Sequence, residues 1–129
     1  RVTMDLGANV TLTGGVALQT QESWCEFISK DLQSISFGGN AAEVYFEEDK
    51  FDDFLKKLAA IKGIFYVHPV QQYTWGQKVI RFYDPDFHIL EVGENMKSVC
   101  RRFLDSGMTI EAAAIRMNVS EKFVRACVR

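Results

Sequence analysis

The chain has 129 residues, of which 47% are hydrophobic and 25% charged, and its formal net charge is −2. This ordinary globular composition is enough to build the core of one compact domain with a small appendage. No apolar run approaches the ~20 residues that span a bilayer, and no signal segment opens the chain. Together with three cysteines that show no ligand-like spacing, Cys25, Cys100 and Cys127, this favours a cytoplasmic protein with reduced thiols and no membrane partner.

Charge divides the chain near Met96. Residues 1–96 carry eight basic and fourteen acidic side chains, whereas residues 97–129 carry seven basic and three acidic side chains. We therefore expect a main domain at residues 1–95 and a helical tail at residues 96–129. Because the chain begins with Arg1 directly inside a strand-like segment, we also expect an N-terminal segment to have been left out.

The first forty residues predict a strand meander followed by a connection. Short segments rich in β-branched residues are separated by glycines that permit positive φ at tight turns. These predicted strands are Val2–Leu6, Asn9–Thr13 and Gly15–Gln19. The pattern is weak over residues 20–40, where residues 22–30 favour one or two helical turns and residues 38–40 break whatever precedes the next strand.

The second half predicts the order β-α-β-β-β. A strand at Ala42–Glu47 is followed by apolar residues at helical spacing from Phe51 to Lys62, and Gly63 supplies a C-terminal stop. Three further strands are predicted at Ile64–Val67, Lys78–Tyr83 and His88–Val92. The first half shows only the last three strands of such a unit, so the chain contains a partial internal repeat.

The last predicted hairpin contains an acidic residue among apolar neighbours. The triplet Asp84-Pro85-Asp86 has turn chemistry, because proline presets φ and each aspartate can bond to nearby backbone amides. Glu91 then follows on an inward-facing strand. An isolated carboxylate in that position is costly unless a metal ion, an arginine or hydrogen-bond donors satisfy it.

Residues 82–91, Phe-Tyr-Asp-Pro-Asp-Phe-His-Ile-Leu-Glu, resemble the last hairpin of the vicinal oxygen chelate superfamily, the glyoxalase/bleomycin-resistance/dioxygenase proteins. Phe87 stands where that family usually has glycine. Residues 9–19, 42–47 and 75–77 add weaker similarity. The resemblance implies an α+β fold of paired βαβββ modules with curved mixed sheets around a cleft, in which the first module lacks its first strand and helix. It also implies a small-molecule ligand and a homodimer.

The resemblance further implies a divalent metal ion of unidentified kind, held by Gln19, Glu43 and Glu91, with a further ligand from the missing strand. Two carboxylates and an amide oxygen are hard ligands that suit Mg²⁺, Mn²⁺ or Ca²⁺. Glu43 and Glu91 are then also the candidate catalytic residues. The residues themselves leave a second interpretation open, in which Glu91 pairs with Arg81 or Lys78 across the hairpin and Glu43 points to solvent.

Aromatic residues gather in the connection and the second half, where they can line a pocket or build a core. The candidate ligand-binding residues are Trp24, Tyr45, Trp75, Arg81 and Tyr83. His68, which precedes Pro69 in a loop-like setting, and His88, which follows the turn, are interpreted as structural residues rather than ligands.

The tail predicts three short helices, at Lys97–Asp105, at Ile110–Met117 capped by Thr109, and at Glu121–Val128 capped by Ser120. Its last two helices resemble a small helix-turn-helix, and a net charge of +4, from seven basic and three acidic residues, is compatible with DNA. The basic patch is modest, however. We therefore favour packing or a partner contact over DNA binding.

Three functions remain open at this point. The first is a glyoxalase-like metalloenzyme, such as a lyase, isomerase or dioxygenase, in which the metal polarises a carbonyl or enediolate. The second is a metal-free, ligand-sequestering protein of the bleomycin-resistance type. The third is a ligand-sensing transcriptional regulator in which the cleft is the sensor and the tail its output.

Overall fold

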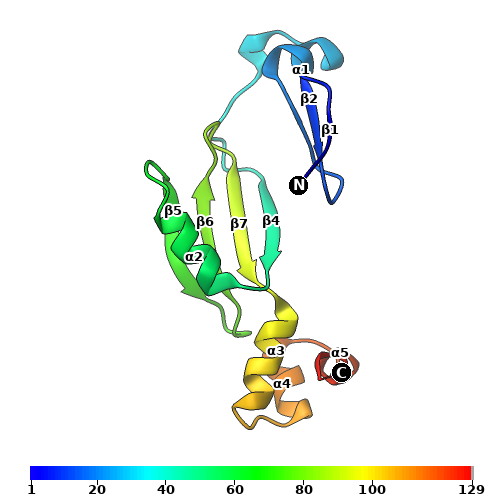
Figure 1. Ribbon diagram of the computed structural model, residues 1–129, viewed down its shortest axis with the longest axis vertical. Coiled ribbons are helices and arrows are strands. Elements are labelled where there is room, and N and C mark those ends of the chain that lie inside the picture. The colour runs from blue at the N-terminus through cyan, green and yellow to red at the C-terminus, as the bar shows by residue number, and fades with distance from the viewer. Residues whose placement is uncertain (129) are drawn as a thin grey trace. The chain divides into compact units, whose positions relative to one another are not determined.

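The computed structural model describes residues 1–128 (Figure 1). It divides the chain into two compact units, Arg1–Phe37 and Gly38–Arg129. The first unit contains an antiparallel sheet of order β1-β2-β3, followed by helix α1 and one 3-10 turn. The bounds are β1 Val2–Asp5, β2 Asn9–Leu12, β3 Ala17–Gln19, α1 Gln21–Ile28 and η1 Leu32–Ser34. The predicted meander is therefore confirmed, with slightly shorter strands.

The second unit begins with a βαβββ module, which is the order that the sequence predicts. Its strands β4 and β7 run parallel to each other, whereas β5, β6 and β7 form antiparallel pairs, so that the sheet has the order β4-β7-β6-β5. The bounds are β4 Glu43–Glu48, α2 Phe51–Ala59, β5 Tyr66–Gln72, β6 Lys78–Tyr83 and β7 Ile89–Glu94.

Helix α2 covers one face of this sheet (Figure 1). Phe51 and Leu58 of the helix are each only 4% exposed. They pack with Ile80 and Phe82 of β6 and Val92 of β7. Successive side chains of a strand point to opposite faces. Arg81, which lies between Ile80 and Phe82, and Glu91, which precedes Val92, therefore point to the other face of the sheet.

Strand β5 differs from its prediction. It runs from Tyr66 to Gln72, instead of ending at Val67, and includes Pro69. Proline lacks an N–H for a sheet ladder, but β5 is an edge strand with irregular register around His68, and such positions tolerate proline. His68 therefore lies in a strand, and the prediction of a loop around it is wrong.

The turn between β6 and β7 has the predicted aspartate chemistry. The Asp84 carboxylate accepts hydrogen bonds from the amides of Asp86 and His88, each at 2.9 Å, and from His88 Nδ1 at 2.9 Å. Burial acts to raise the pKa of Asp84, but these hydrogen bonds outweigh it and lower the pKa. Phe87 has φ of +63°, the left-handed conformation that normally favours glycine, so this turn has a glycine-like backbone at a phenylalanine.

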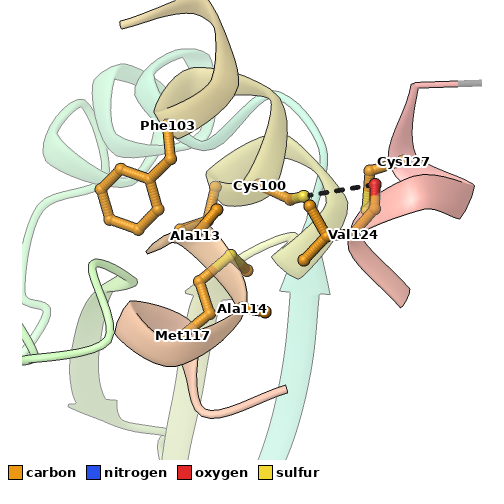
Figure 2. Close-up of a cluster of buried hydrophobic side chains, with 8 residues drawn as sticks. Cys100, Phe103, Ala113, Ala114, Met117, Val124 and Cys127 are labelled. Carbon is orange, nitrogen blue, oxygen red and sulfur yellow. Dashed lines mark hydrogen bonds between the residues drawn. The ribbon is translucent and has the colours of Figure 1, made fainter. Parts of the chain in front are cut away.

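The tail forms three helices, as the sequence predicts, and residues 97–128 contain no strand. They are α3 Met96–Asp105, α4 Ile110–Met117 and α5 Glu121–Cys127. The hydroxyl groups of Thr109 and Ser120 cap α4 and α5. Figure 2 shows the core that the three helices share, with Cys100 and Phe103 from α3, Met117 from α4, and α5 beside them.

Within residues 1–128, no helix is both long enough and apolar enough to cross a membrane.

Candidate functional site

Polar side chains gather on the sheet face opposite α2, which we call the polar face. Four of its residues form one row across the strands, because Tyr45 of β4 pairs with Glu91 of β7, Glu91 with Arg81 of β6, and Arg81 with His68 of β5. Paired residues point to the same side of a sheet, so these four side chains lie next to one another. Glu43 lies on the same face, two residues before Tyr45 on β4.

The guanidinium group of Arg81 is the centre of this face. Its Nε donates to Glu43 Oε2 at 2.7 Å, and its Nη2 donates both to Glu43 Oε1 at 3.4 Å and to Glu91 Oε2. Its Nη1 donates to the Tyr73 hydroxyl at 2.6 Å and contacts His68 Nε2 at 3.2 Å. One cation is therefore shared by two carboxylates, a phenol and an imidazole.

His68 takes a defined tautomer in this arrangement. A guanidinium group has no acceptor, so His68 Nε2 must accept from Arg81. The other ring nitrogen, Nδ1, lies 2.7 Å from the Pro69 carbonyl oxygen and therefore carries the proton that it donates there. The imidazole is thus held beside Arg81 by contacts at both ring nitrogens, a role that the local sequence does not reveal.

The two carboxylates respond in opposite ways to this environment. The hydrogen bond from Arg81 lowers the pKa of Glu43, whereas burial and the neighbouring Glu43 carboxylate raise the pKa of Glu91 despite its contact with Arg81. The side chain of Glu91 is only 8% exposed, against 37% for Glu43. Glu91 is therefore the carboxylate whose charge is harder to keep in this site.

The residues of the polar face do not fit a metal ion as they are arranged. A divalent ion would need the carboxylate oxygens of Glu43 and Glu91, but both groups are bonded to Arg81. Among residues 1–128, no group of three or more His, Cys, Asp and Glu side chains could hold a metal ion. The third predicted ligand, Gln19, lies on β3 of the first unit, where its Nε2 is buried and lacks a hydrogen-bond partner among the described residues.

Gln77 organises the aromatic residues of the polar face, and the sequence does not single it out for this role. The side chain is buried, and its Nε2 donates to the Tyr45 hydroxyl and to the Glu94 carbonyl oxygen, each at 2.9 Å. Its Oε1 accepts from Trp75 Nε1 at 3.1 Å. The only sequence signal is its place directly after Trp75-Gly76, at the start of a strand.

Gly93 makes this arrangement sterically feasible. A Cβ atom at Gly93 would lie 2.8 Å from Gln77 Nε2 and 3.1 Å from the ring of Tyr45. Any larger residue would therefore push the amide or the ring away. The glycine allows the two side chains to meet over β7.

The predicted ligand-binding residues fall into three groups. Tyr45, Trp75 and Arg81 belong to the polar face and its adjoining turn. Tyr83 lies on the same strand as Arg81, where its hydroxyl donates to Asn40 at 2.8 Å and its ring lies 5.8 Å from that of Phe87. Trp24 belongs to α1 of the first unit and is 45% exposed.

A three-stranded sheet, a βαβββ module with one polar sheet face, and a helical tail are the features that a family assignment has to explain. Residues 1–97 match the glyoxalase-like domain family, and the chain belongs to that family. No protein of curated function matches the chain.

Solved structures agree with this assignment. A protein of unknown function from Agrobacterium tumefaciens is 33% identical, with 74% of each chain covered and a TM-score of 0.63. A glyoxalase-related enzyme from Fulvimarina pelagi is 17% identical, covering 74% of this chain and 70% of its own, with a TM-score of 0.59. A glyoxalase/bleomycin resistance protein/dioxygenase from Nocardioides is 19% identical, covering 72% and 65%, with a TM-score of 0.54. The last two share the fold alone.

Proposed function

We propose that this protein binds a small organic molecule on the polar face without the help of a metal ion. The observation that carries the proposal is the position of Arg81, whose guanidinium group is bonded to both of the carboxylates that a metal ion would need. A fixed cation already neutralises part of their charge. The polar face therefore supplies hydrogen bonds and aromatic surface, rather than open coordination positions.

Charge and aromatic rings favour a cationic, aromatic ligand. The polar face has more negative than positive charge, because it carries three carboxylates, those of Glu43, Glu47 and Glu91, and the one guanidinium group of Arg81. Tyr45 is 45% exposed, and the rings of Tyr73 and Trp75 are stacked with their centroids 4.5 Å apart. Aromatic faces and carboxylates together attract organic cations.

Two probes of similar size and opposite charge test this proposal. Benzyltrimethylammonium should bind in calorimetric or NMR titrations at millimolar concentration or better, whereas benzoate should not. Glu43→Gln should weaken the binding of the cation at least threefold, because it removes one of the exposed negative charges. Glu111→Gln, which removes an exposed carboxylate from α4, is the matched control and should bind like the wild type. Preference for benzoate, or equal binding by Glu43→Gln, would contradict the proposal.

A divalent-metal-dependent lyase, isomerase or dioxygenase is the second candidate, with Glu43 and Glu91 as its ligands on the polar face. One observation favours it, which is that Glu43 and Glu91 lie close enough to share one cation. A metal ion would then have to displace Arg81. Elemental analysis of protein purified without chelator or metal-affinity resin separates the two candidates. Stoichiometric metal that is lost in Glu91→Gln would support the enzyme and overturn the metal-free proposal.

We also propose a homodimer. Strand β4 is an edge of its sheet, and it exposes Val44 to 37% and Phe46 to 45%. An exposed sheet edge with apolar side chains is a natural surface for pairing with a second copy. Light scattering at micromolar concentration should give about twice the chain mass of 14.7 kDa, and a value near that mass would contradict the proposal.

A further inference from the structure

Helix α3 of the tail contacts the turn between β5 and β6. Arg102 Nη2 donates to the Gly76 carbonyl oxygen at 2.9 Å and to the Glu94 carboxylate at 2.8 Å. The ring of Phe103 lies against Gly76, where an added Cβ atom would come within 2.1 Å of its Cζ. Gly76 also has φ of +90°. The turn and the helix therefore meet at a point that only glycine can occupy.

The same turn carries residues of the polar face. It is closed by two backbone hydrogen bonds, from Gly76 to the Tyr73 carbonyl and from Tyr73 to the Gln77 carbonyl, each at 2.9 Å. The Tyr73 hydroxyl accepts from Arg81 at 2.6 Å, and the Gln77 amide links Trp75 to Tyr45. Residues 73–77 are thus one hydrogen-bonded turn that contacts the tail through Gly76 and the polar face through Tyr73 and Gln77.

Glu94 gives the tail a second connection to this turn. Its carboxylate accepts from Arg102 and from the amide of Lys78 at 3.3 Å, while its carbonyl oxygen accepts from Gln77 Nε2 at 2.9 Å. Arg102 is therefore joined to Gln77 along two routes, through Gly76 and through Glu94. Contiguous hydrogen bonds and packed side chains of this kind carry energetic coupling between sites.

We infer that Arg102 and Phe103 are positioning residues of the polar face, so that docking of the helical tail sets the orientation of Tyr73, Trp75 and Gln77 and thereby the affinity of the site. This inference rests on the proposed function for the location of the ligand. It gives the tail a role in small-molecule binding that does not depend on a macromolecular partner. Loss of the Arg102 contacts frees the turn to move. Movement of Tyr73 then alters its hydrogen bond to Arg81, and movement of Gln77 alters its hydrogen bond to Tyr45.

Signals of the ligand-free protein test the positioning role directly. The indole N–H of Trp75 and the Nε–H of Arg81 both donate hydrogen bonds in the polar face and can be followed in ¹H–¹⁵N spectra. Arg102→Ala should shift both signals. Arg101→Ala removes an exposed arginine from the neighbouring position of α3 and should shift neither.

Binding of benzyltrimethylammonium tests the consequence for the site. Arg102→Ala should weaken it roughly fivefold or more, within the range of ordinary coupling between sites. Arg102→Lys, whose ammonium group can reach Gly76 and Glu94, should restore most of the affinity and most of the signal positions. A purely structural contribution would lower stability without moving the two signals, and would leave the affinity of the folded protein unchanged.

The possible outcomes separate this inference from the proposed function. Unchanged Trp75 and Arg81 signals in Arg102→Ala would overturn the inference, and so would shifted signals with an unchanged affinity. If the wild type binds neither probe, the proposed function fails, while the ligand-free signals still decide whether α3 positions the turn. Should Arg102→Ala not fold, Phe103→Leu reports on the same contact, because it keeps an apolar side chain but loses the ring against Gly76. It should shift the Trp75 signal, and no shift would overturn the inference.

Discussion

The two sheets of this protein differ most in what covers them. The four-stranded sheet of the second unit is covered by α2 and buries Ile80, Phe82 and Val92 against it. In the three-stranded sheet of the first unit, Val2, Met4 and Leu18 are 56%, 55% and 57% exposed, and Cys25 is the only buried residue between positions 1 and 37. In this protein a sheet face forms a core where an amphipathic helix excludes water from it.

Hydrogen exchange should show the largest difference between the two sheets. Amides of β6 and β7 should be protected by several orders of magnitude more than those of β1, β2 and β3, because local opening is easiest where few apolar contacts are lost. Exchange followed by mass spectrometry or NMR at neutral pH measures this. Equal protection of the two sheets would contradict this prediction, because it would mean that the amides of the first sheet are as well shielded from water as those of the second.

Two leucine-to-alanine substitutions, one in each unit, should differ clearly in how much stability they cost. Leu58→Ala removes a side chain that is 4% exposed and should destabilise the second unit by about 2–5 kcal/mol. Leu18→Ala, at a position that is 57% exposed on β3, should change stability by less than about 0.5 kcal/mol. Urea denaturation measures both, and similar losses would contradict the contrast between the units.

Replacing Arg81 should destabilise the protein by an amount that depends on pH. Arg81→Ala leaves the Glu43 and Glu91 carboxylates without their shared cation, and we expect a loss of about 2–4 kcal/mol at pH 7, since Arg81 is partly exposed. In the variant the folded state should hold a proton on Glu91 more readily than the unfolded state does, because burial and Glu43 already raise its pKa. Protonation then favours folding, so the loss should shrink as the pH falls from 7 towards 5. A loss that is constant over this range would contradict the assignment.

The turn between β6 and β7 should give a smaller effect than the loss of Arg81. The turns between strands of the first unit have glycine at positive φ, at Gly7, Gly14 and Gly15, whereas this turn has Phe87. Phe87→Gly and Phe87→Ala both lose the ring contacts with Phe65 and Tyr83, but only glycine relieves the left-handed backbone. The glycine variant should therefore be the more stable of the two by about 1 kcal/mol, in contrast to the usual order within helices and strands. Thermal denaturation of the two variants measures the difference.

Local chemistry made several elements predictable. Strand β6 and helix α4 have the predicted bounds, Lys78–Tyr83 and Ile110–Met117, because the β-branched and aromatic residues of the strand and the Thr109 cap of the helix are local signals. Strand β5 was harder to predict, since the tolerance of Pro69 depends on its place at the sheet edge. Edge and interior strands cannot be distinguished within a segment, because the difference lies in the neighbouring strand.

The sequence by itself determined the order of the elements, the family and the presence of a costly carboxylate at Glu91, because turn residues and the pattern of apolar and polar residues are local properties. It left open whether a metal ion or Arg81 would neutralise that carboxylate. Only the sheet register showed that Arg81 reaches it, by placing Glu91, Arg81 and His68 in one row. The roles of Gln77 and of Arg102 also required the tertiary structure, because Gln77 meets Tyr45 and Arg102 meets Gly76 across separations of 32 and 26 residues. Contacts between such distant residues depend on how strands pair and helices pack, and no local pattern encodes them.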